Sequence, residues 1–198
     1  TQVIIGHPFD TYKTWRQSNQ VILNSININN LYKGVIPPLV ANGALNSMFF
    51  GLTTYFYKQT SDELSETSRW FFGGLVSGAI GSIFANPFDI WKINRQIGKQ
   101  TEFRKLPFYR GILLSVAREA PALGLYFSVY HKLVDEFRIH SAISGAITGM
   151  VGWTVTYPID VIKTRIQADY KITLKESVQQ KNFWRGLPLV LVRAPLVN

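Results

Sequence analysis

The stretch His7–Gln17, HPFDTYKTWRQ, places a proline, an acid and a lysine within a segment that is otherwise typical of a helix. A similar stretch, NPFDIWKINRQ, follows at residues 86–96, and a third, YPIDVIKTRIQ, at residues 157–167. In each copy an aspartate lies two residues after the proline, a lysine five residues after it and a glutamine nine residues after it. A helix-bending residue and two opposite charges therefore recur at one spacing three times.

Other sequence features also recur in step with the three prolines. The aligned prolines are Pro8, Pro87 and Pro158. Each is followed by an aromatic–basic–glycine triplet, and the triplets are Tyr32-Lys33-Gly34, Tyr109-Arg110-Gly111 and Trp184-Arg185-Gly186. Glycines precede the second and third prolines at the same offsets, namely Gly74, Gly78, Gly81 and Gly145, Gly149, Gly152. This self-similarity predicts one domain over residues 1–198 built from three repeats, at about 1–60, 61–138 and 139–198, with the first and last helices truncated.

Each repeat is expected to contain two helices. Residues 35–57, 70–88 and 141–159 hold no charged side chain, and helices of this length can cross a bilayer of about 30 Å. The recurring glycines suit the close approach of membrane helices. Buried helices of a soluble bundle would give the same pattern, so charge has to decide between the two.

The distribution of charge favours the membrane. The chain carries a formal charge of +9, which indicates an acidic partner such as nucleic acid, an anionic membrane face or anionic solutes. Residues 92–110 contain six basic residues and one acid, whereas the link at residues 58–69 contains three acids and two bases. With two helices per repeat, basic segments lie on one side of the membrane and links on the other, as topology rules require. No nucleic-acid-binding motif is recognisable, so nucleic acid is not an expected partner.

Catalysis and metal binding have little support in the sequence. Cysteine is absent, which excludes disulfides and cysteine–metal sites. His7, His131 and His140 are scattered, with no nucleophile or metal spacing around them. We therefore expect neither an enzyme nor a metal or other cofactor.

The charged residues of the proline motif share one helix face, because they are spaced at i, i+3 and i+7. They are Asp10, Lys13, Gln17, Asp89, Lys92, Gln96, Asp160, Lys163 and Gln167. Charges within a membrane region are costly unless paired. Three bent helices around a threefold axis would bring each acid near a neighbour's lysine.

In these motifs the chain resembles the mitochondrial carrier family, whose signature is Pro-x-[Asp/Glu]-x-x-[Lys/Arg] in three tandem repeats. The resemblance implies an all-α membrane protein of the inner mitochondrial membrane, with six transmembrane helices in a pseudo-threefold barrel, short matrix-side helices and a monomeric state. It also implies alternating access through a matrix gate. The gate pairs would be Asp10–Lys92, Asp89–Lys163 and Asp160–Lys13, with Gln17, Gln96 and Gln167 beneath them as braces.

The same resemblance suggests where a cargo binds. The positions are on the even helices, about seven residues after each triplet glycine, and are Ala41, Asn42, Arg118, Glu119 and Arg193. An arginine–acid pair resembles carriers of amino acids, acylcarnitine or related amines, with the ornithine and carnitine/acylcarnitine branch closest. The arginines suit a carboxylate or phosphate. Glu119 would take a cationic group or would only orient Arg118. Cardiolipin is a further expected ligand near Tyr32, Tyr109 and Trp184.

Departures from the family pattern keep other cargoes open. Leu45 stands where the basic amino acid branch carries an acid, which favours a zwitterion or an anion. Nucleotides or deoxynucleotides therefore remain an alternative. Short loops and the run VILNSININN at residues 21–30 suggest a virus- or parasite-encoded copy acting in host mitochondria. At the opposite gate, His131 and Val134 replace the usual charged pair, so that gate is expected to be weak or held by other contacts. A non-transporting membrane or DNA-binding structural protein is the remote alternative.

Overall fold

The computed structural model describes residues 2–18, 28–98, 106–184, 186–188 and 190–191, and within these ranges there is no β-strand. The helices are α1 (Gln2–Gln17), α2 (Ile28–Leu31), α3 (Ile36–Gln59), α4 (Glu66–Gln96), α5 (Ile112–His131), the π-helical segment η2 (Lys132–Glu136), α6 (Ser141–Ala168) and α7 (Leu174–Gln179). The all-helical character expected from the sequence is present.

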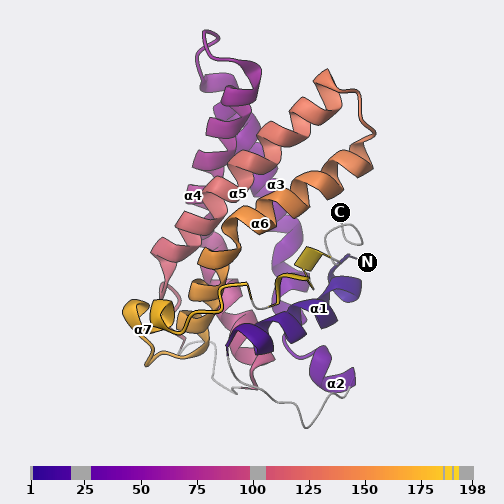
Figure 1. Cartoon of the computed structure of the whole chain (residues 1–198). Helices are drawn as coiled ribbons and strands as arrows, with labels where there is room; N and C mark the ends of the chain where they lie inside the picture. Colours follow the sequence, from indigo (N-terminus) through magenta and orange to yellow (C-terminus); the bar gives the residue numbers. More distant parts are fainter. Residues whose placement is uncertain (1, 19–27, 99–105, 185, 189, 192–198) are drawn as a thin grey trace.

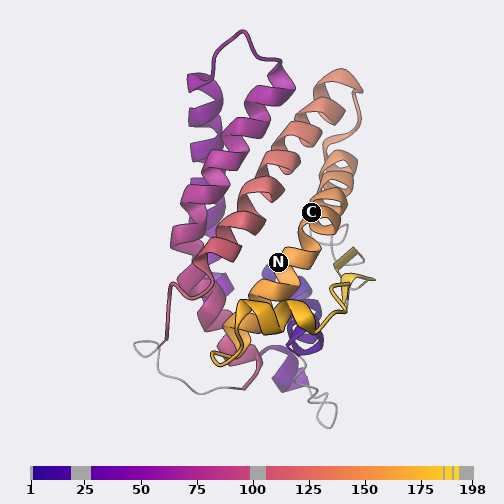
Figure 2. The same cartoon turned by 60° about the vertical axis from the view of Figure 1, so that its left-hand side comes forward.

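Helices α3, α4, α5 and α6 lie side by side in chain order, and each runs antiparallel to the one before it (Figures 1 and 2). The short connections at residues 60–65 and 132–140 lie at one end, which we call the link end. Helices α2 and α7 lie at the opposite end, which we call the basic end, and α1 packs there against α4 and α6. The links between repeats therefore lie at one end of the bundle, and the short helices that follow the proline motifs lie at the other.

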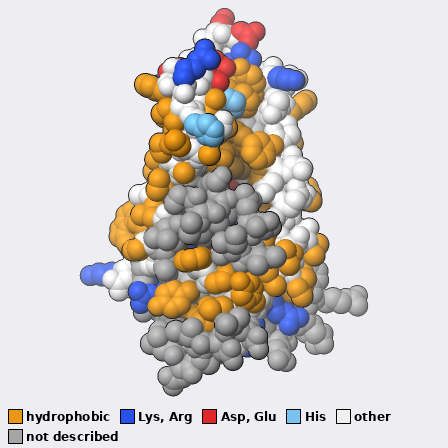
Figure 3. Space-filling model, turned by 90° about the vertical axis from the view of Figure 1, so that its right-hand side faces the viewer, with side chains coloured by type: hydrophobic (Ala, Val, Ile, Leu, Met, Phe, Trp, Pro, Cys, Tyr) orange, Lys and Arg blue, Asp and Glu red, His pale blue; other side chains and the backbone are white. Residues whose placement is uncertain are grey.

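Charge separates between these ends in the described residues. The link end holds the acids Asp62, Glu63, Glu66, Asp135 and Glu136 against the bases Lys58, Arg69, Lys132 and Arg138. The basic end holds Lys33, Arg95, Arg110, Lys171, Lys175 and Lys181 against Asp169 and Glu176. Figure 3 shows hydrophobic side chains over one face, acidic side chains at the link end, and Lys and Arg side chains at both ends. This is the asymmetry that the sequence predicts.

Two helical segments meet the length and hydropathy of a membrane span, namely Glu66–Gln96 and Ile112–Glu136. The first has 31 residues, or roughly 46 Å of helix, which exceeds a bilayer core. Helices α3 and α6 do not meet the same criteria. By composition alone, the described chain thus has two candidate spans.

Each triplet glycine has a left-handed backbone, with φ of +79° at Gly34, +70° at Gly111 and +96° at Gly186. Glycine adopts this conformation without steric cost. Space also requires it at two positions, because a Cβ at Gly34 would lie 3.0 Å from the Lys92 carbonyl oxygen, and one at Gly186 would lie 2.9 Å from the Tyr157 hydroxyl. Each triplet glycine therefore forms a turn, and Gly34 and Gly186 also lie close against α4 and α6 respectively.

The basic residue of the second triplet caps a helix end. Arg110 donates from Nε to the Ile166 carbonyl at 3.0 Å and from Nη2 to the Ile172 carbonyl at 3.0 Å. The Ile166 carbonyl belongs to the last turn of α6, so the cation satisfies an acceptor at the C-terminus of this helix and complements the helix dipole. The Ile172 carbonyl belongs to the segment that follows α6. Its guanidinium lies 5.7 Å over the Tyr170 ring, and burial raises the pKa of the Tyr170 hydroxyl.

Helix α4 packs very closely against α5 through small residues. A Cβ at Gly74 would lie 2.5 Å from the Leu123 carbonyl oxygen, and one at Gly78 would lie 2.6 Å from the Glu119 carbonyl oxygen. The corresponding glycine face of α6 is looser, since a Cβ at Gly152 would lie 3.8 Å from the Ala122 carbonyl oxygen of α5. Helices α4 and α5 are therefore closely packed. The looser packing between α5 and α6 leaves room for a cavity at that interface.

Candidate functional site

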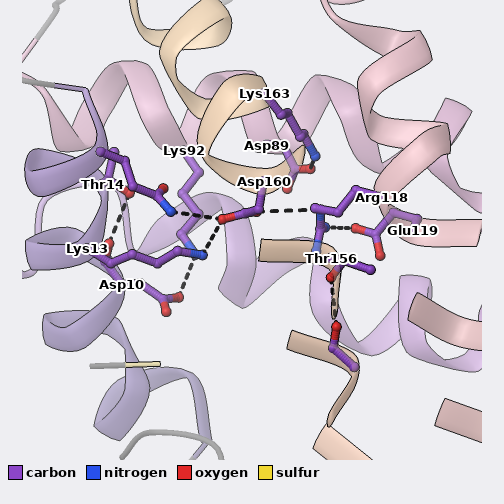
Figure 4. A network of polar contacts seen from close by, with 12 residues as sticks. Asp10, Lys13, Thr14, Asp89, Lys92, Arg118, Glu119, Thr156, Asp160 and Lys163 are labelled. Carbon is purple, nitrogen blue, oxygen red and sulfur yellow. Dashed lines mark hydrogen bonds and ion pairs between the residues drawn. The ribbon is translucent and has the colours of Figure 1, made fainter. Parts of the chain in front are cut away.

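The three proline motifs occupy α1, α4 and α6, and each helix continues through its proline. Three ion pairs join these helices in a closed cycle (Figure 4). They are Lys92 Nζ–Asp10 Oδ2 at 2.6 Å, Lys163 Nζ–Asp89 Oδ2 at 2.6 Å and Lys13 Nζ–Asp160 Oδ2 at 2.7 Å. Each helix gives its lysine to one neighbour and its aspartate to the other, so the structure brings together all six charged residues in the expected pairing. We call this set the ion-pair ring.

The ring is largely withdrawn from water. The side chains of Lys163 and Asp160 are 4% and 8% exposed, while that of Asp89 is 34% exposed. Removing one partner of a buried pair leaves an uncompensated charge and is strongly destabilising. The ring therefore acts as a set of mutually dependent contacts that hold the three helices together at the basic end.

One glutamine contacts the ring directly. Gln17 donates from Nε2 to Asp160 Oδ2 at 3.0 Å. Asp160 also receives Lys13 and has Arg118 Nε at 3.5 Å from Oδ1. This carboxylate therefore has three partners, two from α1 and one from α5.

The other two glutamines do not brace the pairs as the family resemblance implies. Gln96 donates from Nε2 to Thr11 Oγ1 at 3.1 Å and accepts from Thr14 Oγ1 at 2.8 Å. Gln167 donates from Nε2 to Asn86 Oδ1 at 2.9 Å. Both still bridge neighbouring helices, but their partners are hydroxyl and amide groups. Those partners were not predicted, because nothing in a single sequence sets them apart from other polar core residues.

Two cavities lie next to the ring, and both are lined by Arg118 and Trp153. A cavity of about 230 Å³ is lined by the ring and by Ala41, Asn42 and Leu45 from α3. A second, of about 450 Å³, extends towards the link end past Glu119. Arg118 lines both. Four of the five expected cargo residues therefore line one or both of these cavities, whereas Arg193 lies outside the described residues.

Arg118 is held by several groups at once. Its Nη2 contacts Glu119 Oε1, and its guanidinium lies 5.4 Å over the ring of Trp153. Lys13 Nζ lies 4.3 Å from the centroid of that same ring. Glu119 therefore orients Arg118 here, the second of the two roles expected for it. Trp153 was not predicted, although its spacing of seven residues before Asp160 places both on one face of α6.

The remaining sequence candidates lie elsewhere. His7 is 1% exposed, stacks on Tyr32 and has Nε2 3.0 Å from the Lys33 carbonyl oxygen, so its ring takes part in helix packing. Tyr109 and Trp184 are exposed at the basic end. No group of three or more histidine, aspartate or glutamate side chains in the described ranges is arranged to hold a metal ion.

Comparison with known proteins gives a consistent assignment. The family model described as "Mitochondrial carrier protein" matches residues 134–196. The chain is 27% identical to the mitochondrial arginine transporter BAC2 of Arabidopsis thaliana, over 99% of this chain and 82% of that protein. It is 28% identical to the human mitochondrial basic amino acids transporter over 99% of this chain and 82% of that protein. It is also 28% identical to the mitochondrial glycine transporter YMC1 of Saccharomyces cerevisiae, over 85% of this chain and 69% of that protein. The likeness to these mitochondrial transporters extends over the three proline motifs whose charges close into one ring, and the matched family model covers the third of them.

Proposed function

We propose that this protein exchanges small amino acids across the inner mitochondrial membrane by alternating access. The observation that carries the proposal is the ion-pair ring, which closes the cavity at the basic end beneath Arg118. The relatives are named as transporters of arginine, basic amino acids and glycine, which supports an amino acid cargo. None of them is named as an enzyme, so a non-enzymatic carrier is the best-supported class.

In this proposal the ring is a matrix gate. A cargo enters the cavity from the link end, its carboxylate pairs with Arg118, and its ammonium group takes the place of Arg118 beside Glu119. Opening the gate requires the three ion pairs to separate, and the free energy of cargo binding offsets that loss. Since Arg118 also lies near Asp160, a carboxylate that draws Arg118 away weakens one contact of the ring directly.

The architecture follows the family. We infer six transmembrane helices in a pseudo-threefold barrel of three repeats, with the basic end in the matrix and a monomeric state. The odd helices of the repeats would be α1, α4 and α6, and the even helices would include α3 and α5. Exposed aromatic side chains at Tyr109 and Trp184, together with the basic residues nearby, support contact with an anionic lipid such as cardiolipin at this end.

Exchange in proteoliposomes tests the function. Vesicles containing the protein are loaded with one unlabelled solute and supplied outside with labelled arginine, ornithine, lysine, glycine, carnitine, ADP, ATP or a deoxynucleotide. We expect exchange of an amino acid and none of the nucleotides. Exchange of nucleotides alone would replace the proposed cargo, and uptake of no solute by folded protein would overturn the proposal.

Arg118→Ala gives the matching residue test. It removes the group that pairs with the cargo carboxylate and leaves Glu119 unpartnered in the cavity. We expect exchange to fall by about thirtyfold or more, as when one member of a buried charge pair is truncated. Arg138→Ala is the control, because Arg138 is a positively charged, exposed residue at the link end, outside both cavities. Equal rates for the two variants would mean that the cargo site is elsewhere.

A further inference from the structure

Three aromatic rings from three helices are stacked at the link end. Tyr57 lies in the last turn of α3, Trp70 lies near the start of α4, and His131 is the last residue of α5. The Trp70 and Tyr57 centroids are 4.0 Å apart with ring planes at 16°, and the Trp70 and His131 centroids are 3.7 Å apart with planes at 5°. Both faces of the indole are therefore covered, and the stack joins the ends of three helices at the opposite pole from the ion-pair ring.

The histidine side of the stack has one acid. His131 Nδ1 lies 3.1 Å from Asp135 Oδ2 on η2, while Tyr130 of α5 approaches the imidazole edge-on at a centroid distance of 5.6 Å. From α6, the nearby cavity is lined by Ser141, Ala142 and Gly145, which carry no charge. Asp135 is thus the charged group that contacts the imidazole.

The tyrosine side has its own charged groups. The Arg69 guanidinium lies 4.5 Å over the Tyr57 ring and pairs with Asp62 at 2.6 Å. The Tyr57 hydroxyl is 3.5 Å from Glu66 Oε1. The indole separates these groups from His131. A change in the charge of the imidazole therefore affects its direct contacts with Trp70 and Asp135 most strongly.

Protonation strengthens this arrangement. Histidine is the side chain whose charge ordinarily changes between about pH 5 and pH 8. A neutral imidazole on an indole contributes stacking alone. An imidazolium adds a cation–π attraction to tryptophan, the best aromatic partner for a cation, and a charge-assisted hydrogen bond to Asp135. The contacts of His131 with Trp70 and Asp135 are therefore stronger when the imidazole carries a positive charge.

The stack borders the route to the cargo site. A cavity of about 370 Å³ at the link end is lined by Trp70 and His131. It shares Phe50, Tyr126 and Phe127 with the cavity that contains Arg118. The sequence also leaves this end without the usual charged gate pair, since His131 and Val134 occupy those positions.

We propose that Tyr57, Trp70 and His131 form a proton-sensitive latch that ties the ends of α3, α4 and α5 together at the link end and tightens as the pH falls. The latch stabilises the conformation seen here, in which the ring is closed and the link-end cavity is present. Because protonation favours one of the two alternating conformations, it shifts the population towards that conformation and slows exchange. The effect on transport rests on the proposed function, whereas the stack itself does not.

Tryptophan fluorescence tests the stack without any transport. A protonated imidazole in contact with an indole quenches its emission, and the difference between the wild type and Trp70→Phe isolates Trp70 from the other four tryptophans. We expect Trp70 emission to fall between about pH 8 and about pH 5.5 in the full-length protein in nanodiscs. The fall should be absent in His131→Phe, which keeps a ring on the indole but cannot be protonated, and should have a lower midpoint in Asp135→Asn.

A second histidine at the same end supplies the control. His140→Asn keeps a side chain that can cap α6 and should leave the quenching unchanged. Quenching that persists in His131→Phe or in His131→Gln, or that is absent from the wild type, would overturn the latch. Loss of quenching in His140→Asn would show that His140, and not His131, quenches the indole, and this result would also overturn the latch.

Exchange rates then connect the latch to transport. With an amino acid cargo, we expect wild-type exchange to slow by about two- to fivefold from about pH 8 to about pH 5.5, the range given by a cation–π contact at an exposed site, relative to His131→Phe. Identical pH profiles of the two proteins would contradict the proposal. If the wild type exchanges no solute, the proposed function fails, and the fluorescence result still decides whether the latch exists.

Discussion

At the scale of single residues, selectivity is expected to depend on Leu45. This side chain lines the ring-side cavity beside Ala41 and Asn42, so α3 contributes no charge there. Glu119 is engaged with Arg118, and the three aspartates are engaged with lysines. A cargo with an additional positive charge would therefore lack a carboxylate of its own in the described part of the cavity.

Leu45→Glu should move the preference towards cationic amino acids. Arginine and citrulline are suitable probes, because they have nearly the same shape and differ in the charge of the side chain. We expect the arginine-to-citrulline exchange ratio to rise by about tenfold, since a close opposite charge contributes more than 1 kcal/mol at a partly buried site. Leu45→Gln is the matched control and should leave the ratio near that of the wild type. A ratio that does not change in Leu45→Glu would place Leu45 away from the cargo.

The ring allows a second residue-scale test. Asp89→Lys and Lys163→Asp each put like charges together, so each single variant should lose most exchange activity. The double variant restores opposite charges on the same two helices and should recover a measurable part of the rate, which is the interaction term of a double-mutant cycle. Additive losses in the double variant would show that the 2.6 Å pair has no role in the cycle.

At the scale of elements, the glycines of α4 decide how tightly the bundle packs. A methyl group at Gly78 would lie 2.6 Å from a backbone oxygen of α5, and backbone cannot move aside as a flexible side chain can. Gly78→Ala should therefore destabilise the fold by about 1–3 kcal/mol, the usual cost of overpacking. The measurement is the midpoint of thermal unfolding in detergent.

Gly43 is the control for this substitution. It lies within α3, and among the described residues no atom outside the backbone of its own helix lies within 4 Å of a Cβ added there. Gly43→Ala should raise stability by about 0.5–1 kcal/mol, because alanine loses less backbone entropy in a helix. If both variants unfold at the same temperature, close packing of α4 on α5 does not limit stability.

At the scale of the whole molecule, the separation of charge predicts orientation. The chain has no cysteine, so single cysteines can be introduced without removing native ones. Lys132→Cys lies at the link end, and Lys181→Cys lies at the basic end with its backbone in the left-handed region. In mitochondria whose outer membrane has been removed and whose inner membrane is intact, an impermeant thiol reagent should label the first and not the second, because the proposed topology puts the basic end in the matrix. Labelling of both or the reverse pattern would contradict the proposed topology.

Much of this site follows from spacing along the chain. Asp89, Lys92 and Gln96 share one helix face because an α-helix has a period of 3.6 residues, and repetition of the motif implies that three such faces meet. The positions of Arg118 and Glu119 on α5 follow from the same register. The contacts of Gln96 and Gln167 do not, since they depend on which polar groups of another helix happen to lie opposite.

By itself the sequence determined that the chain is helical, that its motif occurs three times in phase, and that charge is unequal between the two kinds of connection. Those properties are local, because they depend on periodicity and on which residues are neighbours in the chain. The tertiary structure alone decided that Asp160 gathers Lys13, Gln17 and Arg118, and that Tyr57, Trp70 and His131 stack at the link end. Contacts of that kind join residues far apart in sequence, and only the packing of whole helices brings them within reach of one another.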